Sequence, residues 1–163
     1  MRAAGCSCPE QIAVHRCRAV VLAAWILLTV CVPPGVAVAA DVVMERDVAV
    51  PMADGTVLRA NVFRPSEGGP FPVLVMRTPY GKPDKVDESL VRAGFIVVVQ
   101  DVRGRYASDG QFESFVRAET HDASDGHDTV EWAAKLPGAS GKVGVFGTSY
   151  PGFLAWRAAR LRS

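Results

Sequence analysis

The sequence predicts an α/β protein with a mixed sheet, in which parallel strands are preceded by an antiparallel hairpin. Short apolar segments alternate with segments whose apolar residues follow helical spacing, which is typical of a parallel sheet covered by helices on both faces. Two segments of alternating apolar residues surround an Asp-Gly pair, as in a β-hairpin. The expected strands are residues 42–50, 57–63, 73–76, 95–99 and 143–146, and the expected helices are 83–93, 119–136 and one beginning near 153.

Turn residues separate these elements. Asp54-Gly55 provides the hairpin turn. Gly94 ends the first expected helix, and Pro137-Gly138 ends the second. A long loop containing Gly, Ser and Arg is expected over residues 102–116.

The first forty residues have the pattern of a secretory signal peptide. Arginines within residues 1–18 precede an apolar run over 19–32, and small residues follow at 37–40. We expect cleavage before Ala40 or Asp41, which would place the mature protein outside the cell or in the periplasm. The apolar run is short for a permanent membrane anchor, although an uncleaved anchor stays open as an alternative.

Composition excludes several classes of function. The chain has 163 residues, enough for one domain, and a formal net charge of +1. Such a small charge gives no reason to expect nucleic acid or an anionic membrane as partner. All four cysteines precede residue 40, so the domain expected over residues 41–163 has no disulfide, catalytic thiolate or cysteine-ligated metal. No cofactor is expected either.

The candidate catalytic segment is Gly-Thr-Ser-Tyr-Pro-Gly at residues 147–152, between the last expected strand and the last expected helix. In a nucleophile elbow, small residues permit a tight turn that exposes the hydroxyl, here that of Ser149, at a helix N-terminus. The backbone N–H of Tyr150 would then face the oxyanion. Pro151 occupies the usual position of the last glycine, and Ser149 as a simple helix cap is the alternative.

Five stretches of the chain stand out together. They are residues 54–58 (DGTVL), 77–82 (RTPYGK), 100–105 (QDVRGR), 125–132 (DGHDTVEW) and 147–152 (GTSYPG). In sequence, order and spacing they resemble the CocE/NonD hydrolases, which include cocaine esterase, α-amino-acid ester hydrolases and Xaa-Pro dipeptidyl-peptidases. The resemblance implies the N-terminal part of an α/β-hydrolase fold, truncated after the nucleophile elbow.

The resemblance also implies roles at the matching positions. Ser149 is the implied nucleophile, Tyr80 the implied phenol donor of the oxyanion hole, and Tyr150 its backbone N–H donor. A phenol suits this position because it stays protonated at neutral pH and can donate to a developing negative charge. From the residues alone, a loop aromatic that packs on the sheet edge is the favoured interpretation of Tyr80, and the resemblance reverses this preference.

The general base and the acid that orients it are expected to follow the serine in this fold. Residues 150–163 contain no Asp, Glu or His. The expectation is therefore an N-terminal fragment that lacks two members of the triad and turns over ester poorly by itself.

Acidic and histidine residues cluster upstream, and they offer two alternatives. The cluster could hold a metal ion, or His127 could act as a surrogate base. Acidic residues near a helix N-terminus also interact favourably with its dipole, which is the simpler explanation. The cluster comprises His121, Asp122, Asp125, His127 and Asp128.

Arg103 and Arg105 have two interpretations. They could contact a carboxylate substrate, or they could order the loop that follows Asp101 through salt bridges and backbone carbonyls. The second interpretation is the favoured one.

The leading hypothesis is a serine hydrolase that cleaves an ester or amide through an acyl-Ser149 intermediate. The expected partner is a small-molecule ester or amide or a short peptide. An inactive truncated product and an exported binding or scaffold domain are the alternatives.

Overall fold

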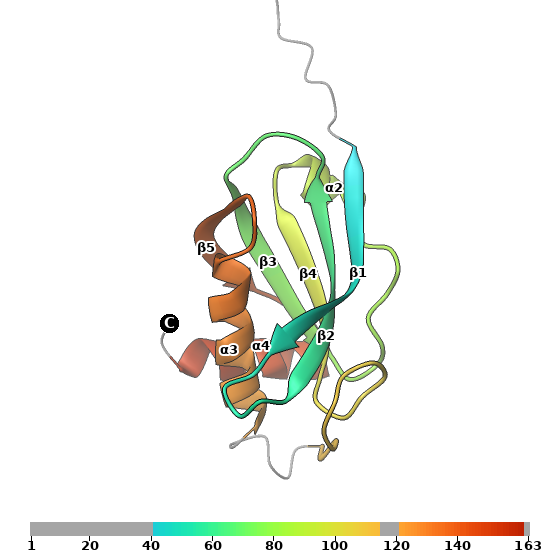
Figure 1. Ribbon diagram of the computed structural model, residues 1–163, viewed down its shortest axis with the longest axis vertical. Helices are drawn as coiled ribbons and strands as arrows, with labels where there is room; N and C mark the ends of the chain where they lie inside the picture. Colours follow the sequence, from blue (N-terminus) through green and yellow to red (C-terminus); the bar gives the residue numbers. More distant parts are fainter. Residues whose placement is uncertain (1–40, 115–120, 162–163) are drawn as a thin grey trace, which may run out of the picture. The chain divides into compact units, whose positions relative to one another are not determined.

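The structure is a computed structural model that describes residues 41–114 and 121–161. The predicted signal peptide and its cleavage site at Ala40 thus lie outside the described residues. Figure 1 shows a sheet with helices packed on both sides. The elements, in chain order, are β1 (Val42–Pro51), β2 (Val57–Pro65), β3 (Phe71–Thr78), α2 (Glu88–Arg92), β4 (Ile96–Asp101), α3 (Ala123–Ala134), β5 (Ala139–Val145) and α4 (Tyr150–Arg160).

The five strands described form one mixed sheet in the order β1-β2-β4-β3-β5. β1 and β2 pair in antiparallel fashion, and β2 is antiparallel to β4. β3 lies between β4 and β5 and is parallel to both. The predicted fold class, a mixed sheet that begins with a hairpin, is confirmed.

A β-bulge interrupts the first strand pair. The register between β1 and β2 shifts between Glu45 and Val48. Asp47 in this bulge has a positive φ of 49°, and its backbone N–H donates to Oδ1 of Asn61 at 3.1 Å. The bulge bends β1 and turns Asp47 away from the regular ladder.

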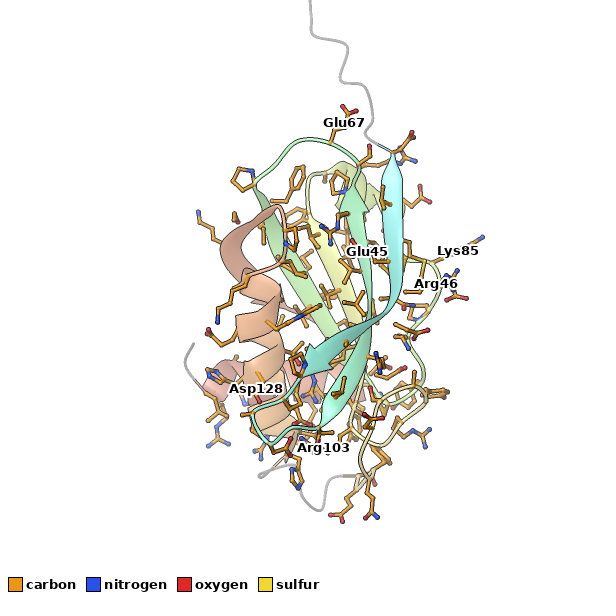
Figure 2. All side chains as sticks on the ribbon, in the orientation of Figure 1. Glu45, Arg46, Glu67, Lys85, Arg103 and Asp128 are labelled. Carbon is orange, nitrogen blue, oxygen red and sulfur yellow. The ribbon has the colours of Figure 1, made fainter. Side chains whose placement is uncertain are left out.

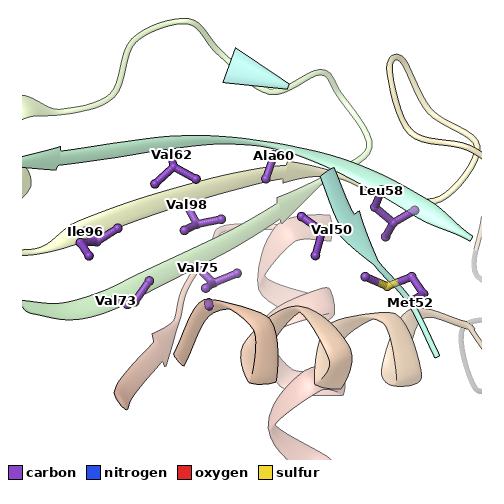
Figure 3. Close-up of a cluster of buried hydrophobic side chains, with 10 residues drawn as sticks. Val50, Met52, Leu58, Ala60, Val62, Val73, Val75, Ile96 and Val98 are labelled. Atoms are coloured by element: carbon purple, nitrogen blue, oxygen red, sulfur yellow. The ribbon is translucent and has the colours of Figure 1, made fainter. Parts of the chain in front are cut away.

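The two faces of the sheet carry separate apolar clusters. On one face, residues of β1 to β4 pack against α3, and Figure 3 shows Val62, Val75 and Val98 pointing toward that helix. On the other face, Phe63 and Val97 pack with Val91 of α2. Fully apolar strands are expected where both faces are covered, and every residue of β4 is buried.

Several boundaries differ from the sequence predictions. The helix expected over 83–93 is only Glu88–Arg92, because Asp87 caps it by accepting a hydrogen bond from the N–H of Ser89. The helix expected from residue 119 begins at Ala123 within the described residues, and the last helix begins at Tyr150 rather than near 153.

The strand expected over residues 143–146 is β5 (Ala139–Val145), but the expectation that helices cover both of its faces was wrong. Much of β5 is exposed. The reason is its position, because it is the outermost strand on its side of the sheet formed by the described residues.

Within residues 41–114 and 121–161, no helix is long and apolar enough to cross a bilayer.

Candidate active site

Ser149 stands in a tight turn between β5 and α4. Its φ of 61° and ψ of −128° lie outside the regions that ordinary residues occupy. Its side chain is exposed, and its carbonyl accepts the first helical hydrogen bond, from the N–H of Phe153 at 3.0 Å. An exposed serine in a strained strand-to-helix turn has the geometry of a nucleophile elbow.

Two glycines allow the strand and the helix to approach closely at this turn. A Cβ on Gly147 would lie 2.6 Å from Cβ of Pro151, and a Cβ on Gly152 would lie 2.9 Å from the carbonyl oxygen of Gly147. Both distances are shorter than van der Waals contact. The glycine needed for close approach is thus Gly152, and Pro151 is accommodated in the first turn of α4.

Tyr150 holds the start of α4 in the protein interior. Its side chain is buried beside Val102 and Leu154. Its ring packs against Phe112 and Phe153, with centroids 6.5 and 6.0 Å away. Because this side chain is anchored, the backbone N–H of Tyr150, the residue that follows Ser149, is held in a fixed position.

The side chain of Tyr150 lies close to that of Asp122, a buried residue at the N-terminus of α3. Burial raises the pKa of Asp122, and the nearby charge of Asp125 adds to this effect. The positive charges of Arg77 and Arg157 and the neighbouring phenol of Tyr150 act in the opposite direction without cancelling it.

Tyr80 lies in the loop that follows β3, and its residue is 63% exposed. In the parallel pair β3–β5, Val75 lies opposite Val145. The loops that follow the two strands, which contain Tyr80 and Ser149, therefore leave the sheet at the same edge. Open α/β sheets bind ligands at the carboxyl ends of their parallel strands.

A buried ion cluster orders the segments behind this edge. The carboxylate of Asp125 is 1% exposed and accepts hydrogen bonds from Nε of Arg103 at 3.0 Å and from its terminal nitrogen at 2.6 Å. Arg103 also reaches Asp54 at 2.8 Å and Oγ1 of Thr56 at 2.6 Å. The hydrogen bond to Asp125 raises the pKa of Arg103, and the hydrogen bond from Arg103 lowers the pKa of Asp54.

Arg77 extends the cluster under α3. Its side chain is 3% exposed and lies 3.6 Å from the Asp125 carboxylate. It donates to Oε1 of Gln100 at 2.9 Å and to the carbonyl of Asp122 at 2.7 Å. Oε1 of Gln100 also accepts from Thr129 at 3.0 Å. These contacts join β3, β4 and α3.

Arg105 orders the loop that precedes Tyr80. Its Nε donates to the carbonyl of Pro79 at 3.0 Å, and its guanidinium lies 5.3 Å from the ring of Tyr106 and 5.0 Å from that of Phe112. With the contacts of Arg103, this confirms that the two arginines order the loop after Asp101.

The metal alternative has no support in the geometry of the acidic segment. Asp125 is paired with arginine, and Asp128 accepts a hydrogen bond from the N–H of Ala53 at 2.8 Å. Figure 2 shows Arg103 and Asp128 together near the turn between β1 and β2. In the described part of the chain, His121 and His127 included, no group of three His, Cys, Asp or Glu residues could hold a metal ion.

A groove of about 670 Å³ lies between α3, β5 and α4, and its lining includes Val130, Val143 and Ala158. None of the three predicted site residues lines it.

The sequence reasoning missed Lys82 and Asp101, which form a buried ion pair beside the loop of Tyr80, with Nζ of Lys82 2.8 Å from Oδ2 of Asp101. A carboxylate at the end of a strand that begins with the apolar run 96–99 was the available signal.

The strand order, the helices on both faces and the exposed serine in the turn after β5 define a protein with the α/β-hydrolase fold. The chain belongs to the X-Pro dipeptidyl-peptidase (S15) family, whose model matches residues 54–163.

Among known proteins, the chain is 41% identical to cocaine esterase of Rhodococcus sp. (strain MB1 Bresler) over 124 residues, which are 71% of this chain and 21% of the relative. A CocE/NonD family hydrolase from Staphylococcus aureus is similar in structure, with a TM-score of 0.66, 30% identity, and coverage of 74% of this chain and 25% of that one. An α-amino acid ester hydrolase gives a TM-score of 0.63, 28% identity, and coverage of 74% and 23%. The chain thus spans about a fifth to a quarter of the length of these relatives, and the predicted family is confirmed.

Proposed function

We propose that this chain carries the nucleophile and oxyanion donors of a serine hydrolase that cleaves an ester or amide bond. The observation that carries the proposal is the backbone of Ser149, which holds an exposed hydroxyl in a strained turn at the start of α4. The relatives support the same chemistry, because an esterase and an amino acid ester hydrolase are among them. The substrate class is accordingly a small ester or amide or a short peptide.

In the proposed reaction, Oγ of Ser149 attacks the carbonyl carbon while a general base accepts its proton. The phenol of Tyr80 and the N–H of Tyr150 donate to the oxyanion of the tetrahedral intermediate. The carbon–oxygen or carbon–nitrogen bond then breaks, the leaving group takes the proton from the base, and water hydrolyses the acyl-serine. The proposal assigns the base and its orienting acid to a part of the protein outside this chain.

The test uses the protein expressed from its complete gene, with a p-nitrophenyl ester and an Xaa-Pro p-nitroanilide as substrates. We expect Ser149→Ala to lower kcat by at least about 10³-fold, because the acyl intermediate cannot form. Ser66→Ala, which alters an exposed loop serine, is the matched control and should behave as wild type. Equal turnover by wild type and Ser149→Ala would contradict the proposal and favour a binding domain or an inactive product.

We also propose that the protein is exported after cleavage before Ala40 or Asp41. The order of arginines, apolar run and small residues in residues 1–40 supports this proposal. Cleavage there would also leave β1 intact, because that strand begins at Val42. N-terminal sequencing of protein from the culture medium or periplasm tests the proposal. Recovery of chains that all begin at Met1 would reject it.

A further inference from the structure

Lys82 lies two residues after Tyr80, and its side chain is only 8% exposed. Its backbone N–H donates to Oδ1 of Asp101 at 2.7 Å, and its Nζ donates to Oδ2 of the same carboxylate at 2.8 Å. Nζ also lies 2.7 Å from the carboxylate of Asp47. One buried carboxylate at the end of β4 therefore holds both the main chain and the side chain of Lys82.

The β1 bulge and β2 hold the same loop from the other side. Asp47 donates its N–H to Oδ1 of Asn61, and Nδ2 of Asn61 donates to the carbonyl of Pro83 at 3.0 Å. Asn61 is buried. The bulge thus places the carboxylate of Asp47 against Lys82, while the neighbouring strand fixes the next residue of the loop.

The residues before Tyr80 are fixed as well. The N–H of Tyr80 donates to Oγ1 of Thr78 at 3.1 Å, and Arg105 holds the carbonyl of Pro79. The backbone around position 80 is therefore tied down on both sides, although the tyrosine ring itself is exposed. An exposed aromatic ring on an immobilised loop is the arrangement required of a pre-organised hydrogen-bond donor.

Charge supports the anchoring. Burial acts to lower the pKa of Lys82, but the hydrogen bonds to Asp101 and Asp47 outweigh it, and the net shift is upward. The hydrogen bond from Lys82 lowers the pKa of Asp47. Lys82 and Asp47 are thus both charged at neutral pH. Buried ion pairs are inefficient as general stabilisers, so a fixed geometry is a better account of this one.

We propose that Lys82, held by Asp101 and Asp47, is a positioning residue that fixes the phenol of Tyr80 in the oxyanion hole. This inference rests on the proposed function, because it requires Tyr80 to donate to the oxyanion. Lys82 itself does not touch the substrate.

The test is a double-mutant cycle on the full-length protein with a p-nitrophenyl ester. We expect Tyr80→Phe to lower kcat by about 10²- to 10³-fold, the effect of removing one oxyanion donor. Lys82→Met should lower kcat by about 10- to 10²-fold, with KM within about twofold, because a misplaced donor impairs the transition state. Lys85→Met changes an exposed lysine of the same loop and should leave both constants unchanged.

The two variants are then combined. If Lys82 acts through Tyr80, the double variant has the same kcat as Tyr80→Phe alone. Multiplying effects, or an unchanged kcat in Lys82→Met, would overturn the inference while leaving the proposed function intact. An unchanged kcat in Tyr80→Phe would instead remove Tyr80 from the oxyanion hole, and the inference would fail with that assignment.

Two further measurements cover the case in which Lys82→Met does not fold. Asp47→Asn removes only the charge of the exposed partner of Lys82, so it should lower kcat by a smaller factor than Lys82→Met does. Hydrogen exchange should show faster exchange of the amides at residues 80–82 in Asp47→Asn than in Lys85→Met. Identical exchange and identical kcat in these two variants would overturn the inference.

Discussion

Asp125 is the centre of the buried ion cluster, and Asp125→Asn is the substitution we expect to harm the fold most. The change keeps the size of the side chain and removes its charge. One of the two hydrogen bonds from Arg103 loses its acceptor, because an amide offers one oxygen where the carboxylate offers two. Arg77, with 3% of its side chain exposed, loses the one carboxylate that lies within salt-bridge distance of it among the described residues.

The magnitude follows from these contacts. Removing one partner of a buried ion pair typically destabilises a protein by about 3–5 kcal/mol, because the other charge is left uncompensated. Arg103 keeps its contact with Asp54, so we expect a value near the lower end, about 3 kcal/mol. A loss of that size lowers the urea midpoint by about 1–3 M for ordinary m-values.

Urea unfolding followed by circular dichroism measures this loss in the full-length protein. Glu131→Gln is the matched control, because it makes the same chemical change on the same helix in an exposed pair with Lys135 at 3.7 Å. That control should cost less than about 1 kcal/mol. If Asp125→Asn costs no more than Glu131→Gln, the argument that the cluster holds the fold together is refuted.

Two other predictions concern the elbow and the pH dependence of stability. Gly152→Ala should lower kcat by about 10²-fold, because the added Cβ forces the backbone of Gly147 to move, and steady-state kinetics measure it. Gly144→Ala is the control, since its Cβ comes closest to the flexible end of Leu74, at 3.2 Å, and equal kinetics in the two variants would contradict the close-approach argument. The pKa of Asp122 is raised in the folded state above its ordinary value of 3.8, so the folded state favours the protonated carboxyl. The stability that this group contributes is therefore full below pH 3.8 and is lost as the pH rises through the folded-state pKa. The free energy of unfolding of Asp122→Asn should therefore equal that of wild type in acid and exceed it at neutral pH, as measured by urea unfolding. A lower free energy of unfolding than wild type at neutral pH would show that the charged carboxylate does not destabilise the fold.

Local patterns predicted most of the sheet. Which faces of a strand are covered decides where its apolar residues stand, so the alternation in β1 and β2 and the apolar run in β4 could be read directly from the sequence. The burial of β5 was not predictable in this way, because it depends on a neighbouring strand. The start of α2 followed from one side-chain cap at Asp87, which a periodicity argument ignores.

In the candidate site, too, features set by local sequence were predictable, and features set by contacts between distant segments were not. Ser149 was recognisable because a tight turn needs small residues nearby in sequence. The partners of Tyr80 were not recognisable, because Lys82 meets Asp101 only through the register that places Thr78 beside Asp101 in the parallel pair β3–β4. The contact of Arg77 with Asp125 joins β3 to α3 in the same manner.

The backbone of Ser149 has a consequence for how this protein could evolve. A non-glycine residue in such a conformation costs about 1–3 kcal/mol, so glycine would relieve strain at position 149. Ser149→Gly should accordingly unfold at higher urea than Ser149→Ala, while neither variant can form an acyl intermediate. In a copy of the gene released from selection for catalysis, serine would have no advantage at this position. If related sequences retain serine at position 149, this would indicate continued selection for catalysis, because glycine at that position would make the fold more stable.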